Sequence, residues 1–233
     1  MRFALLLLII PACLAVAADK TGYLPYKMGV PLVCAGLLLA CFFRSLLGRG
    51  DIWFVIAAFV FSAIGDYFLS NKRGAESYFV IGIGAYFVAH LGYLGFCLLN
   101  GRLHRIGLAV LLAGYVPYFV FYLRPAIGDP VLLGAVLLYL LISCVVLAAS
   151  LGLKLSPAAK WLYAFGILMI LVSDTFISFN EFLKFKALNG WILPTYYLAH
   201  LAVSGSVMLT GATPPCPVST ANEREGRDGG CIS

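Results

Sequence analysis

Two carboxylic acids stand inside long apolar runs of this sequence, where an ionisable group is rare. Asp66 lies in the run 52–70 and Asp174 in the run 159–179, whereas the other acidic residues fall in connecting segments or in the C-terminal tail. An unpaired carboxylate in membrane hydrocarbon is costly, so such acids usually face an interior cavity and mark a functional site. Two carboxyl groups that share a cavity of low dielectric rarely both ionise, which suits one as a general acid and the other as a base. The structural alternative is a pair of hydrogen-bonded acids that only pack helices.

A second pair of polar residues, His90 and His200, lies in two further apolar runs. Tyr86 and Tyr93 lie about one turn to either side of His90, and Tyr196 lies one turn before His200. Residues three or four positions apart share one helix face, so each histidine belongs to a polar stripe. Such histidines either pack by hydrogen bonding alone or orient a carboxyl group or a water molecule. The residues expected to support the acids in this way are His90, His200, Tyr86, Tyr93, Tyr196 and Tyr197.

Several basic residues lie in the connecting segments at the membrane face nearest the two acids. Charge-assisted hydrogen bonds from these residues would hold the phosphate of a lipid headgroup while the lipid chain lies among the helices. Ordinary contact with bulk lipid at the interface is the alternative for each of them. The expected headgroup-binding residues are Lys27, Lys72, Arg73, Lys184 and Lys186, and the asparagines Asn71 and Asn180 border the same opening.

The elements that position these groups are helices that cross a membrane. Of the 233 residues, 62% are hydrophobic and 11% are charged, whereas a soluble domain is about half apolar and about a quarter charged. The chain contains eight apolar runs, and each must be a helix because lipid cannot satisfy free backbone groups. The runs are about 3–18, 29–47, 52–70, 77–99, 106–123, 131–151, 159–179 and 190–211. The predicted fold is therefore all-α, a polytopic membrane protein of eight transmembrane helices.

The placement of charge bears on partners and orientation. The formal net charge is +6, and because the lysines and arginines lie mostly between the apolar runs they indicate anchoring at lipid headgroups and no nucleic-acid partner. With eight spans both termini share one side, where a small excess of basic residues favours cytoplasmic termini. The two acids then approach the opposite membrane face. The first run is either a retained span or a cleaved signal peptide, since Ala15-Val16-Ala17-Ala18 precedes Asp19.

Short motifs repeat in the same order along the chain. Residues 65–70 (GDYFLS) resemble 173–178 (SDTFIS), and residues 86–91 (YFVAHL) resemble 196–201 (YYLAHL). Four spans separate the copies, so we expect two parallel four-helix halves related by an axis along the membrane normal. The predicted eight-helix domain is 1–211, with halves of about 1–99 and 104–211, and a disordered polar tail follows over 212–233.

Several common catalytic motifs are absent from the sequence. It contains no GxSxG elbow, no HExxH pair and no Walker lysine loop, so it does not support a serine hydrolase, a zincin or an NTPase. No CxxC pair is present either, and two aspartates with two histidines at different depths make a poor metal site. We therefore expect neither a metal ion nor an organic cofactor.

Taken together, these motifs resemble the lysoplasmalogenase family of multispanning membrane proteins, also called the YhhN-like family. The resemblance covers nearly the whole chain up to Gly211. Its carriers are Gly65-Asp66, the run 84–93 with Phe87, His90 and Tyr93, then Ser173-Asp174, and Tyr196-Tyr197 followed by Ala199. The sequence departs from the family in two places. Val30-Pro31 stands where the family has Lys-Pro, with Lys27 one turn earlier, and His200 stands where a glutamine is common.

The resemblance implies hydrolysis of the vinyl-ether bond of a lysoplasmalogen, a single-chain ether lysophospholipid, to a fatty aldehyde and a glycerophospho-choline or -ethanolamine. Cleaving a vinyl ether takes one carboxylic acid and one carboxylate, the division of labour found in glycoside hydrolysis. Asp66 and Asp174 are the expected pair, with the choice of acid and base left open. A proton-coupled transporter that uses the same Asp and His pairs is the alternative, and a non-catalytic lipid-sensing scaffold is a third.

Overall fold

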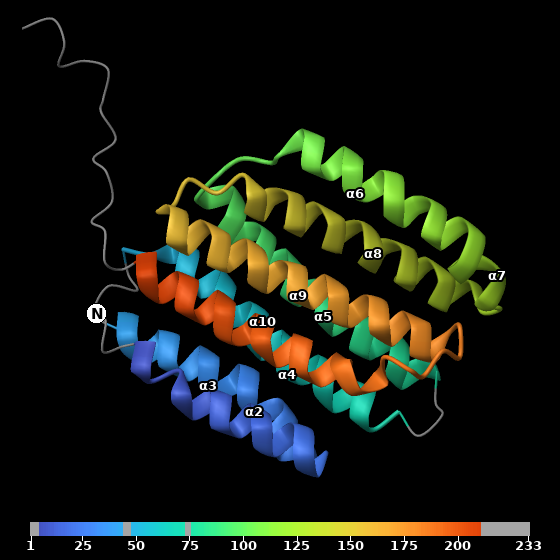
Figure 1. The fold of residues 1–233 in the computed structure, drawn as a ribbon, viewed down its shortest axis with the longest axis horizontal. Helices are drawn as coiled ribbons and strands as arrows, with labels where there is room; N and C mark the ends of the chain where they lie inside the picture. Colours follow the sequence, from blue (N-terminus) through green and yellow to red (C-terminus); the bar gives the residue numbers. More distant parts are fainter. Residues whose placement is uncertain (1–4, 44–47, 73–75, 211–233) are drawn as a thin grey trace, which may run out of the picture.

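Long helices that lie along one another make up the protein (Figure 1). The computed structural model describes residues 5–43, 48–72 and 76–210, so the predicted tail over 212–233 lies outside the described residues. The helices are α2 (Ile9–Thr21), α3 (Leu24–Phe42), α4 (Gly50–Ser70), α5 (Glu76–Leu99), α6 (Arg105–Tyr118), the π-helix η1 (Phe119–Leu123), α7 (Arg124–Ala126), α8 (Pro130–Leu151), α9 (Pro157–Glu181) and α10 (Asn189–Thr210). Apart from one isolated bridge between Gly101 and Leu153, the described residues form helices and turns, which confirms the all-α class.

Seven of the described helical segments are long and apolar enough to cross a membrane, so the chain is a multi-pass integral membrane protein. They are Leu24–Phe42, Gly50–Ser70, Ser77–Leu99, Arg105–Ala126, Pro130–Leu151, Pro157–Glu181 and Asn189–Thr210. The first predicted span, 3–18, is the exception among the described residues. Its helix, α2, has 13 residues, about 20 Å by helix rise, which is shorter than the roughly 30 Å of a bilayer's hydrocarbon core.

Six helices form a closed ring around an interior that is shielded from lipid. In this ring α3 packs on α4, α4 on α5, α5 on α8, α8 on α9, α9 on α10, and α10 back on α3. Two further helices lie outside the ring, α2 against α3 and α10, and α6 against α8. Figure 1 shows α2 and α6 on opposite flanks of the bundle. The ring interior is therefore the place where polar side chains can meet away from the hydrocarbon.

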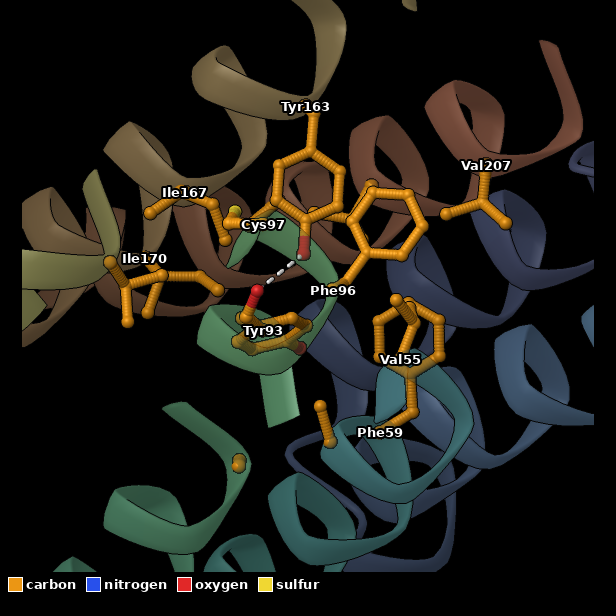
Figure 2. Close-up of a cluster of buried hydrophobic side chains, with 14 of the residues drawn as sticks. Val55, Phe59, Tyr93, Phe96, Cys97, Tyr163, Ile167, Ile170 and Val207 are labelled. Atoms are coloured by element: carbon orange, nitrogen blue, oxygen red, sulfur yellow. Dashed lines mark hydrogen bonds between the residues drawn. The ribbon is translucent and has the colours of Figure 1, made fainter. Parts of the chain in front are cut away.

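Aromatic side chains fill the middle of the ring (Figure 2). Tyr163 of α9 stacks on Phe96 of α5 with ring centroids 4.9 Å apart, and its hydroxyl donates a hydrogen bond of 3.2 Å to the backbone oxygen of Tyr93. Phe59 of α4 meets the ring of Tyr93 edge-on. In lipid, close packing and interhelical hydrogen bonds hold helices together, because apolar burial gains little over contact with lipid chains. This aromatic core therefore fixes the spacing of α4, α5 and α9.

Polar side chains join three helix ends where α4 begins. Asp51, in the first turn of α4, is 7% exposed and accepts two hydrogen bonds of 2.9 Å from the guanidinium of Arg49. Asn100, just after α5, also donates to Asp51, and Arg49 donates to Thr210 at the end of α10. The prediction that only two acids lie within the spans is therefore wrong, since the spans Gly50–Ser70 and Pro157–Glu181 also include Asp51 and Glu181. Because a guanidinium neutralises Asp51, we assign a structural role to Asp51, Arg49, Asn100 and Thr210, called the Asp51 cluster below.

The start of α2 and the end of α10 lie at the same end of the bundle (Figure 1). The expectation that both termini share one side of the membrane stays a prediction, because residues 1–4 and 211–233 lie outside the described residues. The cytoplasmic location of that side stays a prediction. The division of the chain into two repeated four-helix halves, about 1–99 and 104–211, also stays a prediction.

We expect Gly92→Ala to destabilise the bundle and Gly84→Ala to leave its stability unchanged. A Cβ at Gly92 of α5 would lie 2.5 Å from the backbone oxygen of Phe54 and 3.0 Å from the Cβ of Ala58, so α4 and α5 would have to separate. Overpacking of this kind costs about 1–3 kcal/mol. A Cβ at Gly84, on the same helix, meets no atom within 4 Å. Thermal unfolding of both variants in one detergent measures the difference, and equal midpoints would contradict the close approach of α4 to α5.

Candidate active site

Asp66 is held at the meeting point of three helices. It lies one turn before the end of α4 and is 8% exposed. The hydroxyl of Tyr86 on α5 donates a hydrogen bond of 2.5 Å to its Oδ1 atom, and the hydroxyl of Tyr196 on α10 donates one of 3.2 Å to its Oδ2 atom. The structure thus brings together three of the residues that the sequence analysis selected, Asp66, Tyr86 and Tyr196.

The glycine before Asp66 allows this arrangement. A Cβ at Gly65 would lie 2.8 Å from two atoms of the Tyr86 ring, which is closer than packed atoms can approach. The ring of Tyr86 therefore lies flat against the backbone of α4, and its hydroxyl reaches the next side chain, Asp66. The Gly-Asp order in the sequence has a packing reason as well as a chemical one.

Asp174 on α9 is held by a tyrosine that the sequence analysis missed. The hydroxyl of Tyr139 on α8 donates a hydrogen bond of 2.7 Å to the Oδ2 atom of Asp174. Ser143, one turn further along α8, donates to the backbone oxygen of Tyr139 and approaches the Nε2 atom of His90 at 3.3 Å. The spacing of Tyr139 and Ser143 within the apolar run 131–151 repeats that of Tyr86 and His90, and this polar stripe was the available signal.

The two histidines lie behind the tyrosines that bind the acids. The Nδ1 atom of His200 donates to the backbone oxygen of Tyr196 at 2.9 Å, and the Nδ1 atom of His90 donates to that of Tyr86 at 2.9 Å. A carbonyl oxygen can only accept, so each ring carries a proton on Nδ1. The His200 ring packs 4.4 Å from the Tyr196 ring, and the His90 ring packs 4.9 Å from that of Tyr139. Each histidine therefore contacts an acid-binding tyrosine directly.

Two of the expected supporting residues lie elsewhere. Tyr93 is buried in the aromatic core, where its backbone accepts the hydrogen bond from Tyr163. Tyr197 packs in a cluster with Ala15, Val30 and Tyr196, between α2, α3 and α10, and its ring centroid lies 5.7 Å from that of Tyr196. Neither tyrosine lines a cavity that contains Asp66 or Asp174, and Tyr197 is linked to Asp66 only through its contact with Tyr196.

One cavity is lined by both acids. It has a volume of about 310 Å³ and lies at the end of the ring interior opposite the Asp51 cluster. Its lining residues come from α3, α4, α5, α9 and α10 and from the segments that adjoin them. They are Lys27, Asp66, Leu69, Ser70, Lys72, Phe79, Tyr86, Ser173, Asp174, Ile177, Asn180, Glu181, Asn189, Ile192, Leu193 and Tyr196. We call this space the polar cavity.

A second, smaller cavity of about 80 Å³ adjoins the polar cavity and is lined mostly by apolar and aromatic side chains. The two spaces share Leu69, Phe79, Tyr86, Asp174 and Ile177. The apolar cavity extends between α5, α8 and α9 toward α6, which contributes Tyr115 and Tyr118, and toward η1, which contributes Leu123. Asp174 lines both cavities, whereas Asp66 lines only the polar one.

Charged side chains of both signs border the polar cavity. Lys27 of α3 and Lys72, which follows α4, both line it. The Nζ atom of Lys72 lies 2.6 Å from the Oε2 atom of Glu181 at the end of α9 and 4.9 Å from the ring centroid of Phe79. Glu181 was not among the residues predicted from the sequence, although it lies two positions after the apolar run 159–179. The cavity opening therefore presents an acid as well as two lysines.

The remaining residues predicted to bind a headgroup differ in their placement. Lys184 lines a third cavity beside the polar one. Lys186 is exposed and lines none of these three cavities, and Arg73 lies outside the described residues. Asn180 lines the polar cavity, whereas the side-chain amide of Asn71 donates to the backbone one turn earlier in α4.

Within residues 5–43, 48–72 and 76–210, no three His, Cys, Asp or Glu side chains lie close enough together to hold a metal ion. Catalytic zinc sites usually take three protein ligands. The expectation that the protein uses neither a metal nor an organic cofactor stays a prediction.

The fold and the site together define a class of protein, a multi-pass helical membrane protein whose interior holds two hydrogen-bonded acids beside one cavity. The model of the YhhN family matches residues 26–207 of this chain. The chain belongs to the YhhN family, and the resemblance seen in its motifs is confirmed. The matched range includes both acids and the three tyrosines that donate to them. No solved structure matches the chain.

We expect Tyr86→Phe to destabilise the protein more than Tyr67→Phe does. Removing the Tyr86 hydroxyl takes one of two donors from the buried Asp66, and an unsatisfied buried polar group costs about 1–3 kcal/mol. Tyr67, on the same helix as Asp66, is 45% exposed, so losing its hydroxyl changes little. Thermal unfolding in a common detergent compares the variants. Equal stability would show that the Tyr86 hydroxyl is not bonded to Asp66 in the folded protein.

Proposed function

We propose that this protein is a membrane hydrolase that cleaves the vinyl-ether bond of lysoplasmalogens, with Asp66 and Asp174 as the acid-base pair. The observation that carries the proposal is the shared polar cavity, which both acids line and which continues into an apolar cavity. Membership of the YhhN family supports the same activity, because the family includes lysoplasmalogenases.

Hydrolysis of a vinyl ether requires a proton donor and a base, and the two acids that line the polar cavity can fill these roles. A vinyl ether is cleaved by protonating its β carbon, which gives an oxocarbenium ion at the α carbon. Water then adds to the α carbon, and the resulting hemiacetal breaks down to a fatty aldehyde and an alcohol. One carboxylic acid can deliver the proton and one carboxylate can activate the water, so two acids beside one cavity suffice.

The polarity of the two cavities suits a single-chain phospholipid. The phosphate would lie near Lys27 and Lys72 in the polar cavity, where charge-assisted hydrogen bonds stabilise it. Glu181, which pairs with Lys72, offers an anionic partner for the amine of an ethanolamine or choline headgroup. The alkenyl chain would lie in the apolar cavity. That cavity is small, at about 80 Å³, which favours a lysolipid over a lipid with two chains.

We expect Asp66→Asn and Asp174→Asn each to reduce turnover by about 10³-fold or more, because general acid-base groups contribute about 10²–10⁴-fold. The amide cannot transfer a proton but keeps the size of the side chain. Purified protein in detergent is given a lysoplasmenylethanolamine, and aldehyde release is measured. The matched control is Asp19→Asn, which removes an exposed carboxylate at the end of α2 and should leave turnover unchanged. Full activity in either site variant would remove that acid from the mechanism, and proton-coupled uptake without hydrolysis would favour a transporter.

We expect Val136→Phe to shorten the longest chain that the enzyme accepts. Val136 of α8 is buried and lines the apolar cavity, so a larger ring there would obstruct a long chain and leave a short one unaffected. Leu138→Phe on the same helix is the control, because Leu138 is 59% exposed on the outside of the protein. The measurement is kcat/KM for lysoplasmalogens of increasing chain length. A parallel decrease at every length would contradict the assignment of the chain to this cavity.

A further inference from the structure

The two acids of the site have different surroundings, although they are the same residue type. Both oxygens of the Asp66 carboxyl accept hydrogen bonds, Oδ1 from Tyr86 and Oδ2 from Tyr196. Lys27, which lines the same cavity, lies near enough to attract a negative charge on Asp66. Two neutral donors and a nearby cation all stabilise a carboxylate. Asp66 is therefore the acid of the pair that is better suited to be ionised.

Asp174 has fewer groups that would stabilise a charge. Its Oδ2 atom accepts one hydrogen bond, from Tyr139, whereas the Asp66 carboxyl accepts two. Asp174 also borders the apolar cavity, where a charged group would be poorly solvated. The arrangement favours the protonated form, and because no hydrogen bond to the Oδ1 atom is found among residues 5–43, 48–72 and 76–210, that atom can carry the transferable proton.

The order of atoms in the substrate leads to the same assignment. In a vinyl ether the headgroup is followed by the ether oxygen, then the α carbon, then the β carbon and the rest of the chain. With the headgroup in the polar cavity and the chain in the apolar one, the β carbon lies on the side of the apolar cavity. Asp174 lines both cavities and Asp66 only the polar one, so Asp174 is the acid placed to reach the β carbon.

We propose that Asp174 is the general acid that protonates the β carbon and that Asp66 is the general base that activates the attacking water. This assignment rests on the proposed hydrolase function. It divides the roles by position along the bound lipid, with the proton delivered from the chain side and the water from the headgroup side.

The steps balance in protons and bonds. Asp174 gives its proton to the β carbon as the double bond opens, which leaves an oxocarbenium ion and the Asp174 carboxylate. Water adds to the α carbon while Asp66 takes one of its protons. As the hemiacetal breaks down, Asp174 takes the hydroxyl proton, the bond from the α carbon to the glycerol oxygen breaks, and Asp66 returns its proton to that oxygen. Both acids end in their starting states.

Rescue by azide distinguishes the two roles. Azide is an anionic nucleophile that can replace activated water at the α carbon, but at neutral pH it cannot protonate a carbon. We expect sodium azide to raise lysoplasmenylethanolamine consumption by Asp66→Gly by about tenfold or more, because a missing base costs about 10²–10⁴-fold. The products would include the azide adduct of the α carbon, detected by mass spectrometry. Asp174→Gly should show no rescue, because its protonation step is missing.

The pH dependence of kcat/KM gives a second readout that uses isosteric variants. Activity that needs one ionised and one protonated acid falls at both ends of the pH range. Asp66→Asn should lose the decrease at low pH, which reports protonation of the base, and keep the decrease at high pH. Asp174→Asn should do the reverse. Because it uses the asparagine variants, which keep the size of the side chain, this measurement tests the assignment even if the glycine variants do not fold.

The outcomes separate this assignment from the proposed function. If the wild-type protein releases no aldehyde from a lysoplasmalogen, the proposed function fails and the assignment fails with it. If the wild-type protein is active but azide rescues Asp174→Gly, or rescues neither glycine variant, the function stands and the assignment is overturned. The assignment is also overturned if Asp66→Asn loses the decrease in kcat/KM at high pH and Asp174→Asn loses the decrease at low pH.

Discussion

The structure depends on one constraint, that an acid buried among membrane helices needs hydrogen-bond donors from its neighbours. Asp66 and Asp174 obtain theirs from tyrosine hydroxyls on adjacent helices, whereas Asp51 obtains its own from a guanidinium. The difference matters chemically. A phenol supports a carboxyl group without fixing its charge, whereas a guanidinium in bidentate contact holds the carboxylate ionised. The same residue type can therefore take the proposed catalytic role at one end of the bundle and a structural role at the other.

The packing of the six helices in the ring determines whether tyrosine hydroxyls can reach the acids on adjacent helices. Aromatic packing in the middle of the ring sets the distances between helices, and those distances let a tyrosine on one helix reach an acid on the next. Gly65 shows how tight the tolerance is, because a single methyl group there would displace the Tyr86 ring. The histidines behind the tyrosines add a further layer of contacts. A precise site in this protein thus follows from close packing throughout the ring.

Much of the fold and part of the site could be predicted because the relevant signals are local. Apolar runs identify helices, and the seven spans lie close to the predicted runs. Asp66 and Asp174 stand out as acids in such runs, and both line one cavity. Tyr139 was missed because its role depends on which helix α8 packs against, and a single sequence does not reveal interhelical contacts. Tyr93 shares a helix face with His90, but that face also points into the aromatic core, which periodicity alone cannot distinguish from a cavity.

The Asp51 cluster and the polar cavity lie at opposite ends of α4, and this polarity has a consequence for the membrane itself. One end of the ring is tied together by hydrogen bonds from Asn100 to Asp51 and from Arg49 to Thr210, while the other end presents charged residues around an opening. A lipid that places its headgroup at the open end must come from the leaflet on that side. Turnover would then remove molecules from one leaflet and not from the other. An enzyme built in this way would alter the transbilayer asymmetry of its membrane as well as its composition.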